Sequence, residues 1–266
     1  MSAVSNALHY TVFTKPWPDK PLAELGRFVK DLGFDGIELP VRPNFQIEPE
    51  TITKGLPEAA KILADCGVRI GSVAGPTDEQ TIAACAEAGV PVIRICVAIP
   101  EDTDYLSAID DLQRQWDALV PALDRHGVTI GIQNHCGRCI ANAMQLHHAI
   151  GKYDPKHIAA VWDAAHTALD GEIPELALDI VWSHLCIVNL KNAIYRNTAA
   201  PDAKQADWNT YWTSGSQGLA DWAKVADLLK QRGWTGNVCL TAEYSDHDAV
   251  DNLIAEDIMF AKSCFA

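Results

Sequence analysis

Short runs of β-branched and aliphatic residues alternate with helix-period segments from one end of the chain to the other. Residues 8–14 (LHYTVFT) have the composition of a strand, and residues 21–33 have the spacing of a helix that ends at Gly33. This pairing occurs about eight times, and strict alternation predicts parallel strands joined by right-handed crossovers. Eight such units in 266 residues predict an α/β fold, a single (β/α)8 TIM barrel with a parallel eight-stranded sheet and outer helices.

The main alternative is an open, doubly wound sheet. It is disfavoured because no G-x-G-x-x-G or G-x-x-x-x-G-K-[ST] motif follows an early strand. No linker composition divides the chain, so residues 1–266 are expected to form one domain. Residues 195–217 are expected to be a polar loop. Its aromatic residues would either stack on a sugar ring or anchor the loop, and these are Tyr195, Trp208, Tyr211 and Trp212.

Charge and hydropathy indicate which classes of binding partner the protein can have. The chain has 35 acidic and 21 basic residues, a formal net charge of −14, which repels phosphate backbones and disfavours nucleic acid. Residues 1–6 lack the pattern of a signal peptide, and no apolar run approaches the 18 residues of a membrane span. A cytoplasmic protein with no membrane partner is expected, and a homo-oligomer is one option that the sequence leaves open.

Eight cysteines are scattered along the chain, mostly in apolar surroundings. Only Cys136 and Cys139 form a C-x-x-C pair, and a structural zinc site would need a second pair of ligands at suitable spacing. A thioredoxin-like role would need the motif to open a helix early in a small domain. The cysteines are therefore expected to be buried thiols, and Cys136 and Cys139 to be neither metal ligands nor a required disulfide.

Polar side chains gather where the predicted strands end. The chemistry of such a barrel lies at the carboxyl ends of its strands, so residues from separate strands converge there. Any one of these residues alone would more often be structural, and Glu38 is as likely to be structural as functional. The set at the strand ends comprises Glu38, Arg94, Gln133, Asn134, His135, Asp163, His166, Asn189, Lys191 and Glu243.

Several of these segments, in this order, resemble the xylose-isomerase-like superfamily of sugar isomerases and epimerases. They are GFDGIEL, IQNH, VWDAAH, VNLKN and LTAEY, together with the residues from Gly215 that lead to the last strand. The resemblance implies one divalent metal held by a Glu, an Asp, a His and a Glu on strands five to eight. Asp163 and Glu243 match the second and fourth of these ligands, His166 matches a substrate-contacting histidine, and Lys191 matches the lysine of an H-x-K motif.

Two positions depart from that pattern. Gln133 replaces the first glutamate, and Asn189 replaces the histidine. Both are amides with a carbonyl oxygen that can bind a metal, so Gln133, Asp163, Asn189 and Glu243 remain the candidate metal ligands. An all-oxygen set favours Mn²⁺ or Mg²⁺ over Zn²⁺, and a degenerate pocket without a metal is the alternative. Gln133 cannot act as a base, which argues against the two-glutamate epimerase mechanism.

The resemblance implies an enzyme that moves a proton beside the carbonyl of a small keto sugar through a metal-bound enediolate. The candidate catalytic residues are Glu243, His166, Lys191 and His135, and the candidate substrate-binding residues are Glu38, Arg94, Asn134 and Trp212. One alternative is a lyase that acts on a keto sugar or cyclic ketone with the same site, and another is a non-catalytic sugar-binding or partner subunit. The superfamily's zinc endonucleases are disfavoured because both the rich metal cluster and the basic surface are missing.

Overall fold

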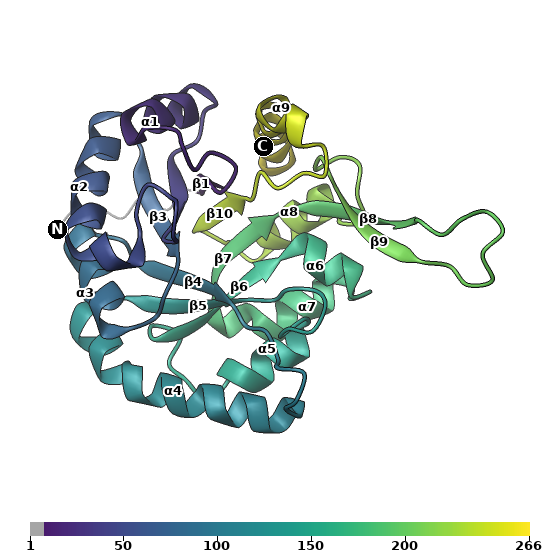
Figure 1. The fold of residues 1–266 in the computed structure, drawn as a ribbon, viewed down its shortest axis with the longest axis horizontal. Helices are drawn as coiled ribbons and strands as arrows, with labels where there is room; N and C mark the ends of the chain where they lie inside the picture. The colour runs from purple at the N-terminus through teal and green to yellow at the C-terminus, as the bar shows by residue number, and fades with distance from the viewer. Residues whose placement is uncertain (1–7) are drawn as a thin grey trace.

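Eight parallel strands close into a barrel in the computed structural model, which describes residues 8–266 (Figure 1). Around the barrel the strands follow the order β1-β10-β7-β6-β5-β4-β3-β2. Their bounds are β1 (His9–Phe13), β2 (Gly36–Pro40), β3 (Arg69–Ala74), β4 (Val92–Cys96), β5 (Thr129–Gln133), β6 (Ile158–Asp163), β7 (Leu185–Leu190) and β10 (Asn237–Leu240). The predicted (β/α)8 barrel is therefore confirmed. Residues 1–6, interpreted above as lacking a signal peptide, lie outside the described residues.

Helices surround the barrel and connect consecutive strands (Figure 1). They are α1 (Leu22–Asp31), α2 (Ile52–Asp65), α3 (Glu79–Ala88), α4 (Tyr105–His126), α5 (Ala143–Ile150), α6 (Ala164–Leu169), α7 (Pro174–Val181), α8 (Trp222–Gln231) and α9 (Val250–Phe265). Short 3-10 turns cover Pro49–Thr51, Trp182–His184 and His247–Ala249. No helix in the described part of the chain is both long enough and apolar enough to cross a membrane.

The ends of α3 and α4 agree with the chemistry of the residues found there. Asp78 and Asp104 cap α3 and α4 by accepting hydrogen bonds from the backbone N–H groups of the first turn. Gly89 and Gly127 end the same two helices with φ values of 70° and 64°. Glycine suits these positions because it reaches positive φ without a steric penalty from Cβ.

An antiparallel hairpin interrupts the alternation after β7. Strands β8 (Asn192–Asn197) and β9 (Trp208–Thr213) pair with each other and extend away from the barrel (Figure 1). The expectation of an unstructured polar loop over 195–217 is wrong for these two segments. Their aromatic and β-branched residues favour a pleated ribbon, and the hairpin brings Trp212 back toward the barrel while Trp208, 60% exposed, lies near its tip.

The barrel interior consists of successive layers. One is a small apolar cluster, distinct from the main core between sheet and helices, and consists of Phe13, Ala74, Val92, Val161, Ile187 and Cys239 with Cys186 packed against it. Side chains two positions apart on a strand face the same side. The residues that follow Val92, Val161 and Ile187 by two positions therefore face inward as well, one layer nearer the carboxyl end of the barrel.

Candidate active site

Three of the predicted ligand positions lie next to one another at the carboxyl ends of adjacent strands. Gln133 ends β5, Asp163 ends β6, and Asn189 lies near the end of β7. Asp163 and Asn189 are register partners, and Gln133 pairs with Val161, the inward-facing residue just below Asp163. Glu243 lies three residues beyond the end of β10 and reaches the same end of the barrel. We call this end, with the residues described below, the mouth.

Asp163 is fully buried, and both its carboxylate oxygens accept hydrogen bonds. Oδ1 accepts from the backbone N–H of His166 at 3.1 Å, which caps α6, and Oδ2 accepts from Nε2 of Gln133 at 2.8 Å. The Oε1 of Gln133 accepts from the Cys96 thiol at 3.4 Å. Burial raises the pKa of Asp163 to about 6, although the charge of Lys191 opposes this shift.

Asn189 has a buried side chain whose polar atoms are both unpartnered. Neither Oδ1 nor Nδ2 finds a hydrogen-bond partner among residues 8–266, and the residue is 0% exposed. A buried amide without partners costs free energy unless something binds it. Asn189 is therefore suited to a ligand that both accepts and donates a hydrogen bond, as a hydroxyl group does.

His135 and His166 are fixed by the same residue, Cys136. Nδ1 of His166 lies 3.1 Å from the backbone nitrogen of Cys136 and accepts its proton. Nδ1 of His135 lies 2.9 Å from the carbonyl oxygen of Cys136 and donates to it, because a carbonyl can only accept. Neutral His166 therefore carries its remaining proton on Nε2, whereas neutral His135 has a lone pair on Nε2.

Both imidazoles are held neutral. Burial, supported by the charge of Lys191, lowers the pKa of His166 to about 2. Burial also lowers the pKa of His135 below its usual 6.5, although its bond to Cys136 opposes the shift. Nε2 of His166 is buried and unpartnered within residues 8–266. The pair therefore presents one hydrogen-bond donor and one proton acceptor near neutral pH.

Glu243 is held by two lysines. Lys191 Nζ lies 2.9 Å from Oε2, and Lys15 Nζ lies 2.5 Å from Oε1. Burial alone would raise the pKa of Glu243, but the two ammonium groups outweigh it and lower the pKa to about 2. Lys191 also lies 3.6 Å from the ring centroid of Trp212, whose indole packs edge-on against His166 at 5.3 Å. Glu243 is therefore an ionised partner of lysines and a weak base.

Glu38 and Arg94 form a buried ion pair in the barrel interior. Nε of Arg94 donates to Oε1 of Glu38 at 3.0 Å, a terminal guanidinium nitrogen donates to the same oxygen, and Ser72 donates to Oε2 at 2.9 Å. Burial opposes the charge of Arg94, but Glu38 outweighs it and raises the pKa of Arg94. These groups satisfy the carboxylate of Glu38, which supports the structural one of its two expected roles. Arg94 lines a cavity at the carboxyl end of the strands, and the substrate contact expected of it stays a prediction.

Asn134, for which a substrate contact is predicted, has its polar atoms engaged within the protein. Its Oδ1 accepts from the backbone N–H of Asp163 at 2.8 Å, and its Nδ2 donates to Thr167 at 3.1 Å. Its side chain is 0% exposed. Asn134 therefore braces the turn from β6 into α6 and leaves no polar atom for a substrate. Adjacent residues on an extended segment face opposite sides, which separates Asn134 from Gln133.

The four predicted metal ligands do not fit a divalent cation as they are arranged. Gln133 turns its NH₂ group, not its carbonyl, toward Asp163, and both oxygens of Glu243 are already bound by ammonium groups. Only the amide of Asn189 is unengaged. Hard cations such as Mg²⁺ and Mn²⁺ require several free oxygen ligands. The expected Mn²⁺ or Mg²⁺ thus lacks the donor set it needs.

A different trio, His135, Cys136 and His166, brings potential ligand atoms within 4.8 Å of one another. The backbone of Cys136 already occupies Nδ1 of both rings, and His166 has its proton on Nε2. Metal binding at this trio would break one of these bonds, so it supplies no ready alternative site. All eight cysteines, including Cys136 and Cys139, are free thiols in the structure.

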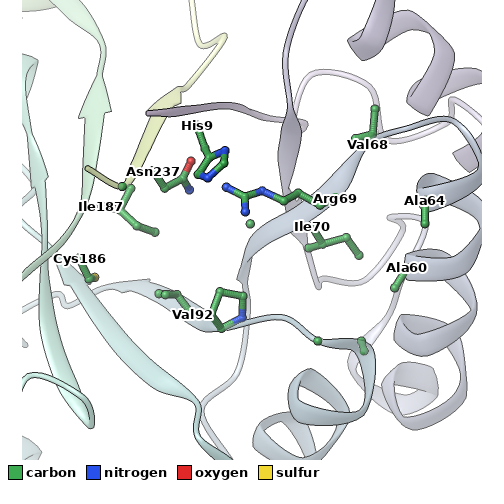
Figure 2. Close-up of a pocket in the computed structure, with 15 residues that line it drawn as sticks. His9, Ala60, Ala64, Val68, Arg69, Ile70, Val92, Cys186, Ile187 and Asn237 are labelled. Atoms are coloured by element: carbon green, nitrogen blue, oxygen red, sulfur yellow. The ribbon is translucent and has the colours of Figure 1, made fainter. Parts of the chain in front are cut away.

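Two cavities lie at opposite ends of the barrel. The larger, about 500 Å³, lies where the strands begin, and His9, Arg69 and Asn237 are among its lining residues (Figure 2). The smaller, about 290 Å³, lies at the mouth and is lined by residues that include Lys15, Lys191, Trp212 and Glu243. Chemistry in this fold belongs to the carboxyl end of the strands. A further cavity of about 410 Å³ at that end is lined by Arg94 and Cys96, and we assign the active site to the smaller cavity because Lys191 and Glu243 line it.

Lys15 is the mouth residue that sequence reasoning missed. It follows β1 by two positions, and a charged residue just past a strand end was a signal that could have identified it. Of the four aromatic residues considered in 195–217, Trp212 lines the mouth cavity. Tyr195 instead donates to the carbonyl of Leu169 at 3.1 Å, which agrees with an anchoring role.

Comparisons with known proteins agree with this architecture. A family model described as "Xylose isomerase-like TIM barrel" matches residues 27–264. A 3-keto-D-glucoside 4-epimerase from E. coli superposes with a TM-score of 0.72 at 14% identity, covering 97% of this chain and 100% of that one. D-psicose 3-epimerase from Clostridium cellulolyticum H10, solved with D-tagatose, gives a TM-score of 0.73 at 13% identity, covering 97% and 99%.

A probable 3-DHS dehydratase from Bacillus anthracis, described as involved in petrobactin synthesis, is also similar. Its TM-score is 0.71 at 14% identity, covering 95% of this chain and 98% of that one. A search of curated protein sequences finds no match to the chain. At such identities the similarity to solved structures concerns the fold alone.

Proposed function

Because the chain belongs to the xylose isomerase-like TIM barrel family, we propose that it is an enzyme that moves a proton beside the carbonyl of a small keto sugar. The observation that carries the proposal is the histidine pair. Cys136 fixes His135 as a proton acceptor and His166 as a hydrogen-bond donor, with ring centroids 4.0 Å apart. Removal of a proton beside a carbonyl requires this combination, a base for the carbon and a donor for the oxygen.

Each residue has a separate role in the proposed proton transfer. His135 Nε2 takes the proton from the carbon beside the carbonyl, and the bonding electrons pass to the carbonyl oxygen. The Nε2–H of His166 donates to that oxygen as its negative charge develops. An isomerisation is completed when the former carbonyl oxygen takes up the proton of the neighbouring hydroxyl group and His135 returns its proton to the former carbonyl carbon, so that the new carbonyl forms on the carbon that lost the proton. Glu243 is unsuited to the role of base suggested by the sequence, because the two lysines hold it ionised.

A neutral, hydroxylated substrate suits the remaining groups. The unpartnered amide of Asn189 can pair with a hydroxyl group as both donor and acceptor. The indole of Trp212 lines the cavity of about 290 Å³ and offers a flat apolar surface to a sugar ring. Similar structures include a 3-keto-glucoside epimerase and a ketohexose epimerase, which makes 3-keto-glucosides and ketohexoses the first substrates to test.

A lyase is the second candidate. The ammonium of Lys191 has three N–H groups, and one of them donates a hydrogen bond to Glu243. After His135 has removed the carbon-bound proton, Lys191 could give one of its other protons to a leaving hydroxyl group. Loss of water from a keto sugar would give an unsaturated ketone. A non-catalytic sugar-binding subunit is the third reading, and it predicts binding without exchange or elimination.

One experiment separates the three. The protein is incubated in heavy water with D-psicose, D-tagatose and a 3-keto-glucoside, and proton NMR follows the loss of the C–H signal beside the carbonyl. Isomerisation predicts deuterium incorporation, whereas elimination predicts a product that absorbs in the near ultraviolet. His135→Gln should abolish either signal, while His147→Gln, an exposed histidine on α5, should not. Sugar binding without either signal would favour the non-catalytic role.

A further inference from the structure

The charged groups around Asp163 and Glu243 balance without a metal ion, and Arg42, which follows β2, adds one more positive charge at this end of the barrel. Asp163 and Glu243 carry the negative charges, and Lys15 and Lys191 carry the positive ones. The remaining ion pair, Glu38 with Arg94, is neutral as a unit. A divalent cation would add two positive charges to a site where Lys191 is 6% exposed, and burial makes such an excess costly.

We propose that the enzyme works without a divalent cation and that the ammonium of Lys191, supported by Lys15, takes the place of the metal beside the reacting carbonyl. This inference rests on the proposed function for the reaction, but its statement about metal binding does not. Lys191 is buried, its Nζ bonds one oxygen of Glu243, and it lies on the face of Trp212. Two of its three N–H groups are left for substrate oxygens once Glu243 takes one.

The orientation of Gln133 supports the same conclusion. Ionised Asp163 defines the orientation, because it can accept only from Nε2, and Oε1 is then the atom that accepts from the Cys96 thiol. The NH₂ group therefore stabilises Asp163 from the side where a metal-binding residue would present an oxygen. A glutamate at this position would do the opposite, since its carboxylate would need a cation between itself and Asp163.

Lys191 then acts directly on the substrate. As His135 takes the carbon-bound proton, electrons move to the carbonyl oxygen, and an N–H of Lys191 donates to that oxygen along with His166 Nε2–H. No oxidant, reductant or further co-reactant enters the step. Lys15 is 46% exposed and contacts Glu243 alone among the mouth's charged groups, so we assign it a positioning role through Glu243.

Metal binding is tested first, independently of activity. The full chain, freed of metal by chelator, is titrated with Mn²⁺, and the electron paramagnetic resonance signal of free Mn²⁺ reports binding. We expect no stoichiometric binding up to about 1 mM, the range of weak protein–ligand contacts. The variant Gln133→Glu should bind one Mn²⁺, and the double variant Gln133→Glu with Asp163→Asn should lose that binding. This pair of variants is the control that the assay detects a metal at the mouth. One Mn²⁺ bound by the native chain and lost in Asp163→Asn would overturn the proposal.

Deuterium exchange supplies the second test. With a substrate that exchanges, addition of chelator should leave the exchange rate within about twofold of the untreated rate. Lys191→Met should lower the exchange rate at least 100-fold, which is comparable to the loss of one oxyanion donor. Lys191→Arg, which keeps the charge, should recover part of the rate, and Lys152→Met at an exposed surface pair is the control. Loss of exchange on chelation, restored by Mn²⁺, would refute the proposal. Absence of exchange in every state would refute the proposed function, and the Mn²⁺ titration would still decide metal binding.

Discussion

His135 and His166 lie against each other with ring centroids 4.0 Å apart, and one residue gives them opposite hydrogen-bonding roles. The N–H of Cys136 donates to His166, and the C=O of Cys136 accepts from His135. Both contacts involve main-chain atoms, so the arrangement depends on the path of the backbone after β5. The side chain of Cys136 is not needed for it.

Replacement of the two neighbouring thiols tests this point. Cys136→Ser with Cys139→Ser should leave deuterium exchange within about twofold of the native rate, because the backbone of residue 136 is retained. Exchange measured by NMR and free-thiol titration check the result. A loss of activity beyond tenfold would mean that a thiol takes part, and it would revive the trio of His135, Cys136 and His166 as a metal site.

The proposed base makes a prediction for His135→Gln. Removal of a general base lowers rates by roughly 100- to 10,000-fold, and the glutamine cannot accept a proton from carbon. We expect that fall in the first-order exchange rate with little change in the free energy of unfolding, since His135 is partly exposed. The matched variant His147→Gln, in α5, should leave the exchange rate unchanged. Equal losses for both variants would indicate a general effect on folding.

The pH dependence of exchange distinguishes His135 from Glu243. A base works only when deprotonated, and the lowered pKa of His135 places the fall in rate below its usual value of 6.5. The rate should therefore be level around neutral pH and decline as the pH falls through the lowered value. If Glu243 were the base, its pKa of about 2 would keep the rate level until the protein unfolds in acid. Initial rates in buffers of constant ionic strength decide between them.

The ion pair inside the barrel makes a stability prediction. Arg94→Met leaves Glu38 charged and buried, and breaking such a pair costs about 3–5 kcal/mol. Urea unfolding should show this loss, and the double variant Arg94→Met with Glu38→Leu should recover most of it, because no unpaired charge remains. Lys152→Met, which breaks an exposed pair with Asp117, should change the unfolding free energy by less than about 1 kcal/mol. A mild effect of Arg94→Met alone would contradict the assignment.

Trp212 should affect substrate binding more than turnover. Its indole lines the mouth cavity and supports Lys191 at 3.6 Å. Trp212→Leu should raise KM several-fold. Trp208 lies on the same strand of the hairpin and is 60% exposed, so Trp208→Leu should change neither KM nor kcat. Steady-state kinetics with a ketohexose measure both. Equal effects of the two variants would place substrate contact along the whole hairpin.

The sequence was sufficient for the barrel and for the positions of Gln133, Asp163 and Asn189, because strand ends are marked by a change in hydrophobic period. It was insufficient for the partners of those residues. The contact of Lys15 with Glu243 joins residues 228 positions apart through two loops, whose folds leave no periodic signal. The hydrogen bonds that join the Asn134 side chain to Asp163 and Thr167 depend on a turn geometry that residue types alone do not define.

The buried layer of Glu38, Arg94 and the apolar residues beneath them also lies between the two ends of the barrel. Val92 and Ile187 line the cavity at the beginning of the strands, and the inward-facing residues two positions further on belong to the mouth side. Water that enters at His9 therefore meets this buried layer before it reaches His135. In the proposed reaction, an intermediate that has lost its carbon-bound proton would be shielded from solvent protons on that side, so we expect exchange with solvent to proceed from the carboxyl end of the strands.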